Sequence, residues 1–159
     1  MKILVTGGCG FIGSNLVDRL ISDGHQVVVI DDESATCHNQ FYYNNRAFYY
    51  KTDISDYVNT RPLYDDVDFV FHLAAESRIQ PALENPLQTV KTNTLGTATV
   101  LQCSREAGVK RVMYSSTSSA YGLNTPPLHE KMDDDCLNPY SVAKVAGEKL
   151  CKMYNDLFG

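Results

Sequence analysis

Short apolar runs alternate with stretches of helical periodicity along the whole chain. Runs that are typical of buried strands occupy residues 1–6, 26–31, 48–51, 67–75 and 110–115. Apolar residues at helical spacing follow the first run and recur after residues 86 and 138. Repeated strand–helix units predict a parallel sheet with right-handed crossovers and helices on both faces. We therefore predict an α/β fold with a Rossmann-like, doubly wound parallel sheet.

The two long helical stretches have clear boundary signals. Pro86 can open a helix that ends near Gly108, with an apolar stripe made of Leu87, Val90, Thr94, Ala98 and Leu101. Asn138 and Pro139 can start a last helix, whose stripe is Ala143, Ala146, Gly147, Leu150, Cys151, Tyr154, Leu157 and Phe158. The hydrophobic residues within 34–46 follow neither a helical nor a strand period, which predicts an irregular excursion there. No internal repeat or low-complexity linker interrupts the chain, so residues 1–159 are predicted to form a single domain.

A glycine-dense turn at residues 7–13 connects the first strand to the first helix. Unpaired N–H groups at the helix start, beside the positive end of its dipole, favour binding of a phosphate group. Gly7 can take the tight turn, Gly10 lets the backbone approach a pyrophosphate, and Gly13 lets the helix lie close to the strand. The spacing is Gly-x-x-Gly-x-x-Gly rather than the commoner Gly-x-Gly-x-x-Gly, and alone it is equally compatible with a structural turn.

The second apolar run ends in two carboxylates, Asp31 and Asp32. A dinucleotide-binding fold places an acid roughly 20 residues after the glycine turn to accept hydrogen bonds from the adenosine ribose. We assign this role to Asp31. A carboxylate there repels the extra phosphate of NADP, so NAD is the expected cofactor. The alternative interpretation is a solvated acidic loop after the strand.

Composition and charge narrow the classes of function. The 159 residues are 43% hydrophobic and 21% charged, as in an ordinary globular domain. A net charge of −5 without a basic block argues against nucleic acid or an anionic membrane as partner. No apolar run approaches the length of a membrane span, so a cytoplasmic location is the default expectation. The cysteines are scattered without metal-ligand spacing, and we expect reduced thiols and no metal site; they are Cys9, Cys37, Cys103, Cys136 and Cys151.

Candidate site residues follow the third and fourth strands. Asp53, just past the third strand, is either a helix N-cap or an acceptor for the adenine amino group. Small residues end the fourth strand and leave room for a ligand at the sheet crevice. His72 in this strand could be a base, but a histidine inside an apolar strand is more often a core group with satisfied hydrogen bonds.

Further candidates follow the fifth strand. Hydroxyls run from Ser115 to Ser119 at the carboxyl edge of the sheet, where open α/β folds bind ligands, although such runs are usually plain loop. Tyr140 and Lys144 are four residues apart on the last helix and so share a face. A lysine ammonium lowers the pKa of a neighbouring phenol from about 10, which makes such a pair a candidate general acid and base. Chance surface pairs of this kind are common.

In order along the chain, these motifs resemble those of the extended short-chain dehydrogenase/reductases, of the NAD-dependent nucleotide-sugar epimerase/dehydratase family. The resemblance runs from Lys2 to the end of the chain. The matching motifs are TGGCGFIG at residues 6–13, Asp31, Asp53-Ile54, HLAA at 72–75, NTLGT at 93–97, SST at 115–117 before Tyr121-Gly122, and NPYSVAK at 138–144. One such motif is weak evidence, whereas the ordered set is highly specific.

The resemblance implies a role for each matching residue. Phe11 and Ile12 would lie along the pyrophosphate, and Asp53 and Ile54 would meet the adenine. Thr117, Tyr140 and Lys144 match the catalytic Ser/Thr and the Tyr-x-x-x-Lys pair. The cofactor-binding residues expected from the motifs and the resemblance are Gly7, Gly10, Phe11, Ile12, Gly13, Asp31, Asp32, Asp53, Ile54, Leu73, Ala74, Ala75, Ser77, Thr92, Ser115, Tyr140 and Lys144.

The implied activity is NAD-dependent epimerisation of a nucleotide sugar, with a UDP-hexose as the expected substrate. Tyr140 would take the proton from a sugar hydroxyl as the carbon beneath gives hydride to the nicotinamide, and Thr117 would hydrogen-bond the same oxygen. Lys144 would hold the nicotinamide ribose and favour the phenolate. A 4,6-dehydratase would instead eliminate water from the 4-keto sugar, and such relatives carry Asp-Glu where this chain has Ser118-Ser119. We therefore favour 4-epimerisation, although Glu76-Ser77 resembles the dehydratases.

Members of this family are considerably longer chains, in which further sheet strands and most of a substrate-binding domain follow the part that matches here. We therefore expect this chain to bind NAD without turnover. A non-catalytic NAD-binding module is the alternative. Relatives commonly pair the helix at residues 87–107 and the last helix across a two-fold axis, so a homodimer is expected.

Overall fold

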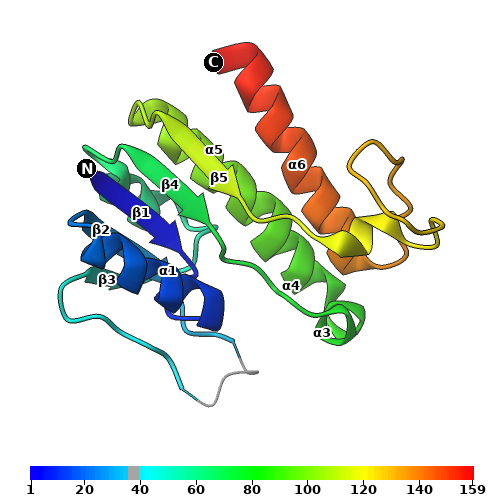
Figure 1. Cartoon of the computed structure of the whole chain (residues 1–159), viewed down its shortest axis with the longest axis horizontal. Helices are drawn as coiled ribbons and strands as arrows, with labels where there is room; N and C mark the ends of the chain where they lie inside the picture. Colours follow the sequence, from blue (N-terminus) through cyan, green and yellow to red (C-terminus); the bar gives the residue numbers. More distant parts are fainter. Residues whose placement is uncertain (36–39) are drawn as a thin grey trace.

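A single parallel sheet lies between helices on both faces (Figure 1). The structure is a computed structural model, and it describes residues 1–35 and 40–159. In the sheet order β3-β2-β1-β4-β5, the strands are β1 (Lys2–Thr6), β2 (Gln26–Asp31), β3 (Phe48–Lys51), β4 (Phe69–His72) and β5 (Arg111–Tyr114). All neighbouring strands in this order are parallel. The predicted α/β, Rossmann-like architecture is thereby confirmed.

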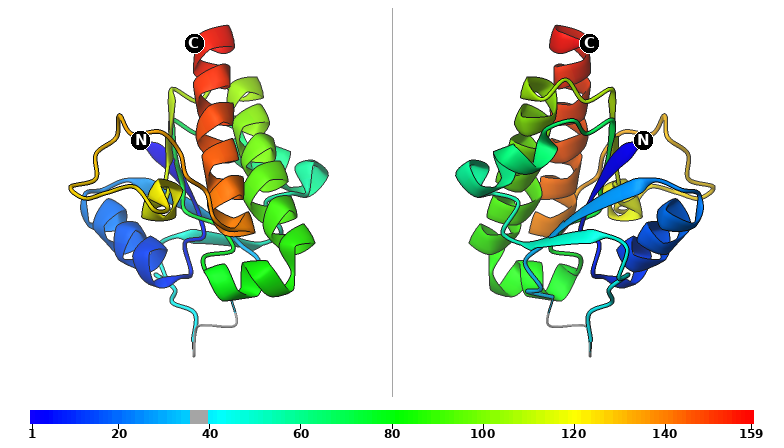
Figure 2. Two further views of the ribbon diagram at one scale, coloured as in Figure 1. Left: turned by 90° about the vertical axis from the view of Figure 1, so that its right-hand side faces the viewer. Right: turned by 90° about the vertical axis from the view of Figure 1, so that its left-hand side faces the viewer.

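Helices of very different lengths connect the strands. The helical elements are α1 (Phe11–Ser22), α2 (Tyr57–Thr60), η1 (Arg61–Tyr64), α3 (Ile79–Glu84), α4 (Pro86–Val90), η2 (Lys91–Gly96), α5 (Thr97–Glu106), η3 (Ser118–Tyr121) and α6 (Pro139–Phe158). Figure 2 shows α1 on one side of the sheet and α5 beside α6 on the other. None of the described helices has both the length and the apolar character needed to cross a membrane.

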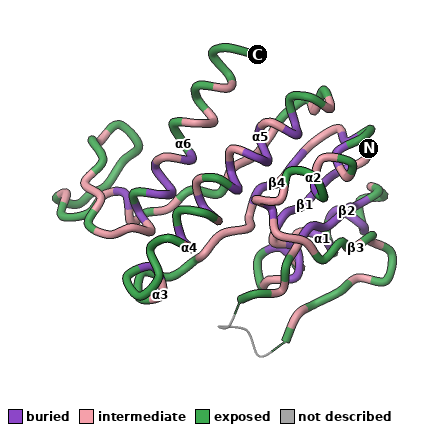
Figure 3. The backbone as a smooth tube through the Cα atoms, turned by 180° about the vertical axis from the view of Figure 1, so that it is seen from behind, coloured by how far each residue is buried: buried purple, intermediate pink, exposed green. Residues whose placement is uncertain are grey.

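Each face of the sheet has its own hydrophobic core. Side chains alternate between the faces along a strand, so Leu4 of β1 packs into one core and Ile3 and Val5 pack into the other. α1 closes the core that contains Ile3, and α5 together with η1 closes the core that contains Leu4. The buried residues therefore concentrate in the central strands and on the inner side of α5 (Figure 3).

The predicted boundaries are confirmed where local signals define them. α6 begins at Pro139, and the Asn138 side chain accepts a hydrogen bond from the Ser141 N–H at 2.9 Å. Asp53 is not a helix N-cap, because Asp56 caps α2 by accepting from the Asn59 N–H. The fourth and fifth strands are shorter than the predicted ranges 67–75 and 110–115. Cys9, Cys103, Cys136 and Cys151 are free thiols, and Cys37 lies outside the described residues.

The predicted helix over residues 86–107 is interrupted by the π-helical turn η2. A π turn holds more residues than an α turn, so it rotates α4 relative to α5. The predicted stripe is therefore wrong at its first half: Leu87 is 82% exposed and Val90 is 47% exposed. The face that is buried instead consists of Thr89, Asn93, Gly96, Thr97, Val100, Cys103 and Ser104.

The apolar stripe of α6 is buried only near the start of the helix. Ala143 and Gly147 are buried, whereas Leu157 and Phe158 at the other end are exposed (Figure 3). The exposed end is still in contact with α5, since the Arg105 guanidinium lies 3.7 Å from the centroid of the Phe158 ring. The predicted stripe thus faces a neighbouring helix along its second half and is not fully covered there.

Candidate active site

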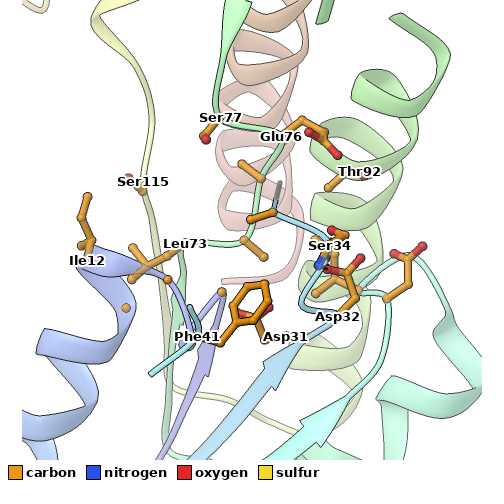
Figure 4. A pocket seen from close by; sticks show the side chains of 18 of the residues that line it. Ile12, Asp31, Asp32, Ser34, Phe41, Leu73, Glu76, Ser77, Thr92 and Ser115 are labelled. Carbon is orange, nitrogen blue, oxygen red and sulfur yellow. Dashed lines mark hydrogen bonds between the residues drawn. The ribbon is translucent and has the colours of Figure 1, made fainter. Parts of the chain in front are cut away.

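A cleft of about 310 Å³ opens at the carboxyl edge of the sheet, the edge where open α/β folds bind ligands (Figure 4). It lies beyond the ends of β1, β2 and β4. Its lining consists of Gly7, Gly10, Phe11, Ile12, Gly13, Asp31, Asp32, Ser34, Ala35, Phe41, Thr52, Asp53, Ile54, Leu73, Ala74, Ala75, Glu76, Ser77, Thr92 and Ser115. The structure thus brings together all the residues expected at the cofactor except Tyr140 and Lys144.

The glycine turn forms one wall of the cleft at very close range. Gly7 has φ +71°, and a Cβ atom added to it would lie 2.7 Å from the Ala74 nitrogen. A Cβ atom on Gly13 would lie 2.1 Å from the Gly7 carbonyl oxygen, so α1 touches the turn backbone. α1 starts after Gly10 with no side-chain cap and no acid in its first turn. Its N–H groups and the positive end of its dipole therefore favour an anionic group in the cleft.

Asp31 connects the end of β2 to this turn. One carboxylate oxygen accepts from the Cys9 N–H and the other from the Glu33 N–H, both at 2.9 Å. Burial raises the pKa of Asp31, and these two backbone donors partly offset that effect. Asp32 is more exposed, and its carboxylate accepts hydrogen bonds from the N–H and hydroxyl of Ser34. The two neighbouring acids therefore differ, since only Asp31 is fixed to the glycine turn.

Asp53, just after β3, also lines the cleft. Its carboxylate pairs with the Lys91 ammonium at 2.8 Å and accepts from the Ser55 N–H and hydroxyl. Burial raises the pKa of Asp53, but hydrogen bonds from Lys91 and Ser55 outweigh burial and hold that pKa below its usual value. Ile54 is buried against Gly96 of η2, where an added Cβ atom would lie 2.6 Å from the Ile54 Cδ1 atom. The π turn thus supports this end of the cleft.

The segment after β4 forms the third side of the cleft. The Asn93 side chain accepts from the Glu76 N–H at 2.8 Å and donates to the Glu76 carbonyl at 3.0 Å. The Glu76 carboxyl group is in the cleft lining beside Thr92, and burial, followed by the charge of Asp32, raises its pKa (Figure 4). The cleft therefore contains a carboxyl group that takes up a proton more readily than an exposed glutamate.

His72 is a core residue with both ring nitrogens bonded. It is 1% exposed, and its Nδ1 and Nε2 atoms lie 2.7 Å and 2.9 Å from the hydroxyl oxygens of Thr6 and Thr97. Burial, with a smaller contribution from the Lys144 charge, lowers the pKa of His72 to about 3. The imidazole is therefore neutral and does not line the cleft, as expected of a satisfied core histidine.

The three residues that match the catalytic motif are not among the residues that line the cleft. Thr117 caps η3 and accepts from the Ser119 N–H at 3.1 Å. Tyr140 is half-buried in the first turn of α6. The Lys144 ammonium is buried, donates to the Ser115 carbonyl at 2.5 Å and lies 4.4 Å from the centroid of the Tyr114 ring. Burial lowers the pKa of Lys144 to about 8.

Five lining residues were not expected from the sequence. Thr52 and Glu76 are direct neighbours of expected residues, so extending each motif by one position would have included them. Ser34, Ala35 and Phe41 belong to the irregular excursion at residues 34–46. No periodicity there indicates which side chains face the cleft.

Comparisons with known proteins agree with this geometry. Residues 3–159 match the family model described as the NAD dependent epimerase/dehydratase family. The UDP-glucose 4-epimerase of Mycolicibacterium smegmatis is 39% identical over 166 residues, which cover 99% of this chain and 52% of that protein. The structure of a Thermotoga maritima UDP-glucose 4-epimerase with UDP-glucose superposes with a TM-score of 0.94 at 34% identity, over all of this chain and 52% of the other.

A second solved structure, a Thermus thermophilus UDP-glucose 4-epimerase in complex with NAD, superposes with a TM-score of 0.91 at 26% identity. That match covers all of this chain and 52% of the other. The chain spans about half the length of the relatives it matches. With the cleft, the ordered motifs and the family model all in agreement, the chain belongs to the NAD-dependent epimerase/dehydratase family.

Proposed function

We propose that residues 1–159 form the NAD-binding domain of a nucleotide-sugar 4-epimerase, and that this part alone binds NAD without turnover. The observation that carries the proposal is a single cleft whose lining includes an uncapped helix start, Asp31 and Asp53. The UDP-glucose 4-epimerases that the chain matches are about twice as long, which supports a substrate-binding part outside these residues. The cytoplasmic location expected from the sequence stays a prediction.

The lining suits NAD along its whole length. The glycine turn with Phe11 and Ile12 would hold the pyrophosphate, Asp31 with Asp32 the adenosine ribose, and Asp53 with Ile54 the adenine. The nicotinamide end would be held by the lining residues Leu73, Ala74, Ala75, Ser77, Thr92 and Ser115, together with Tyr140 and Lys144 of α6, which are outside the lining. Bound NAD would supply a hydride acceptor that later returns the hydride.

The protein side chains would manage the proton. In this proposal Tyr140 removes the proton from the sugar 4-hydroxyl and returns it, and Thr117 donates a hydrogen bond to the same oxygen. Lys144 would help to position both Tyr140 and Thr117. Its ammonium is bonded to the Ser115 carbonyl, two residues before Thr117, so it holds the start of α6 close to the loop that carries Thr117.

Dehydratase activity is the second candidate because a protonatable Glu76 lines the cleft. The deciding experiment joins this chain to the C-terminal half of a UDP-glucose 4-epimerase and supplies a UDP-hexose. We expect the 4-epimer without net formation of NADH. A 4-keto-6-deoxy sugar would establish the dehydratase mechanism instead, and turnover by the unfused 159 residues would contradict the division into two parts.

Cofactor choice should depend on Asp31. Asp31→Ala removes the proposed ribose acceptor and the negative charge, so NAD affinity should fall about tenfold while the preference for NAD over NADP narrows. Asp32→Ala is the matched comparison, since among the described residues its carboxylate is hydrogen-bonded to Ser34 and not to the glycine turn. Its smaller proposed share in holding the ribose should change affinity less than threefold. Titration calorimetry with both cofactors measures this. Equal or tighter NADP binding by the unmodified protein would remove Asp31 from this role.

Self-association should involve the layer of α4, α5 and α6. This layer, with the connecting η2, leaves Leu87, Val90, Leu95 and Val142 about half or more exposed, which favours burial against a second copy across a two-fold axis. Light scattering at several concentrations should show a dimer, and Leu87→Asp should shift it to monomer. Val58→Asp, on α2 and 77% exposed, is the control that should stay dimeric. A monomer at every concentration would refute the dimer.

A further inference from the structure

A buried chain of hydrogen bonds runs beneath the cleft and connects four elements. The Ala74 N–H donates to the Thr6 hydroxyl at 3.2 Å, which lies 2.7 Å from His72 Nδ1. His72 Nε2 lies 2.9 Å from the Thr97 hydroxyl, which donates to the Asn93 carbonyl at 2.7 Å. Thr6, His72, Asn93 and Thr97 are each at most 1% exposed. We refer to Ala74, Thr6, His72, Thr97 and Asn93, which these hydrogen bonds connect in that order, as the relay.

Counting protons fixes the direction of every bond in the relay. The Thr97 hydroxyl has one proton, and it goes to the Asn93 carbonyl, which can only accept. His72 Nε2 must therefore carry a hydrogen and donate it to Thr97. Nδ1 is then without a proton in the neutral ring, so the Thr6 hydroxyl donates to it and still accepts from the Ala74 N–H. Every hydrogen bond of the relay is therefore donated in the same direction, from Ala74 towards Asn93. Each N–H or O–H proton in it takes part in a single hydrogen bond.

One end of the relay, Ala74, lines the cleft, and the other end, Asn93, is bonded to Glu76, which also lines it. Ala74 lies against the glycine turn, where a Cβ atom on Gly7 would be 2.8 Å from the Ala74 Cα atom. At the other end, the Asn93 side chain holds the Glu76 backbone through two hydrogen bonds. The wall formed by residues 74–76 is therefore fixed at both ends by hydrogen bonds to the buried side chains of Thr6 and Asn93.

We propose that His72 is a positioning residue: as a neutral imidazole with its proton on Nε2, it holds residues 74–76 against the glycine turn and thereby sets the affinity for the cofactor. The proposal rests on the proposed NAD-binding function for its affinity readout. The hydrogen bonds of the relay involve protein groups alone and can be tested without the cofactor.

The surroundings of His72 favour the neutral ring. The groups that face it are the Tyr114 ring of β5, with centroids 5.5 Å apart, and the Lys144 ammonium of α6, whose charge opposes a second positive charge. No carboxylate is hydrogen-bonded to the imidazole in the described part of the chain. A second ring proton would have to be on Nδ1, where it would point at the Thr6 hydroxyl. Thr6 could then no longer donate a hydrogen bond to the ring.

The relay can be tested without cofactor by ¹⁵N NMR of the histidine ring. We expect a His72 signal of the Nε2–H form that stays neutral from pH 8 to about pH 5, in contrast to an exposed histidine, which titrates near pH 6.5. A signal from the Nδ1–H form, or a protonated ring at pH 6, would overturn the relay. This result does not depend on whether NAD binds.

The affinity effect is tested by calorimetry on variants that are folded at the temperature used. Thr97→Val removes the link between His72 and Asn93 and should weaken NAD binding about tenfold. Thr99→Val removes a buried hydroxyl from the same helix but not from the relay, and it should stay within about twofold. His72→Asn keeps an acceptor for Thr6 and should bind NAD more tightly than His72→Leu.

Failure of the relay and failure of the proposed NAD-binding function would give different results in these experiments. Absence of NAD binding by the unmodified protein would refute the function, and the NMR signal would still decide the relay. Unchanged NAD affinity in both Thr97→Val and His72→Leu would overturn the positioning role of His72, even with the expected ring form.

Discussion

Replacing Gly13 with alanine should abolish measurable NAD binding and lower the free energy of unfolding by about 3 kcal/mol. The added methyl group would lie 2.1 Å from the Gly7 carbonyl oxygen and 2.7 Å from the Gly8 Cα atom. Both are backbone atoms, so α1 would have to move away from the turn. Its first N–H groups would then no longer face the cleft. Chemical denaturation and calorimetry measure the two effects.

Gly24→Ala is the matched control for this experiment. Gly24 has φ +82°, so a side chain strains the backbone, but nothing lies within 4 Å of the added atom. We expect a loss of about 1–2 kcal/mol of stability and unchanged NAD affinity. If Gly13→Ala bound NAD like the unmodified protein, the close approach of α1 to the turn would not matter for the cofactor.

Tyr140→Phe should lower turnover by about 10²–10⁴-fold in an enzyme that joins this chain to the C-terminal half of a UDP-glucose 4-epimerase. The variant removes the proposed acid/base hydroxyl and keeps the ring, so NAD affinity should stay within about twofold. Steady-state kinetics and calorimetry separate these effects. Lys144→Ala should impair both, because its ammonium is bonded to the Ser115 carbonyl in the cleft wall.

Tyr154→Phe provides the control on the same helix. Its hydroxyl donates to the Gln102 side chain at 2.9 Å, far along α6 from the proposed catalytic pair, so turnover should be unchanged. A fully active Tyr140→Phe enzyme would show that another group moves the proton.

Local signals in the sequence were enough to predict the strands, the glycine turn and the start of α6. Each depends on neighbouring residues, as in the Asn138 cap of α6. The π turn could not be predicted, because Leu87 and Val90 fit an uninterrupted apolar stripe and tertiary contacts of Asn93 and Gly96 decide the phase instead. Likewise, Phe41 reaches the cleft from a segment without periodicity, and only the folded chain shows which side it faces.

The central position of β1 sets the order in which the sheet can be completed. One neighbour, β2, follows soon after α1, but the other, β4, is far along the chain: Ile3 faces Phe69, and the Lys2 N–H bonds to Asp68 across 66 residues. At ribosomal rates of about 5–20 residues per second, β1 remains an open edge for roughly 3–13 seconds after it leaves the ribosome. Closing so long a loop also carries an entropic cost. Assembly of the cleft therefore has to wait until β4 has been made, when β4 pairs with β1 and places Ala74 against the glycine turn.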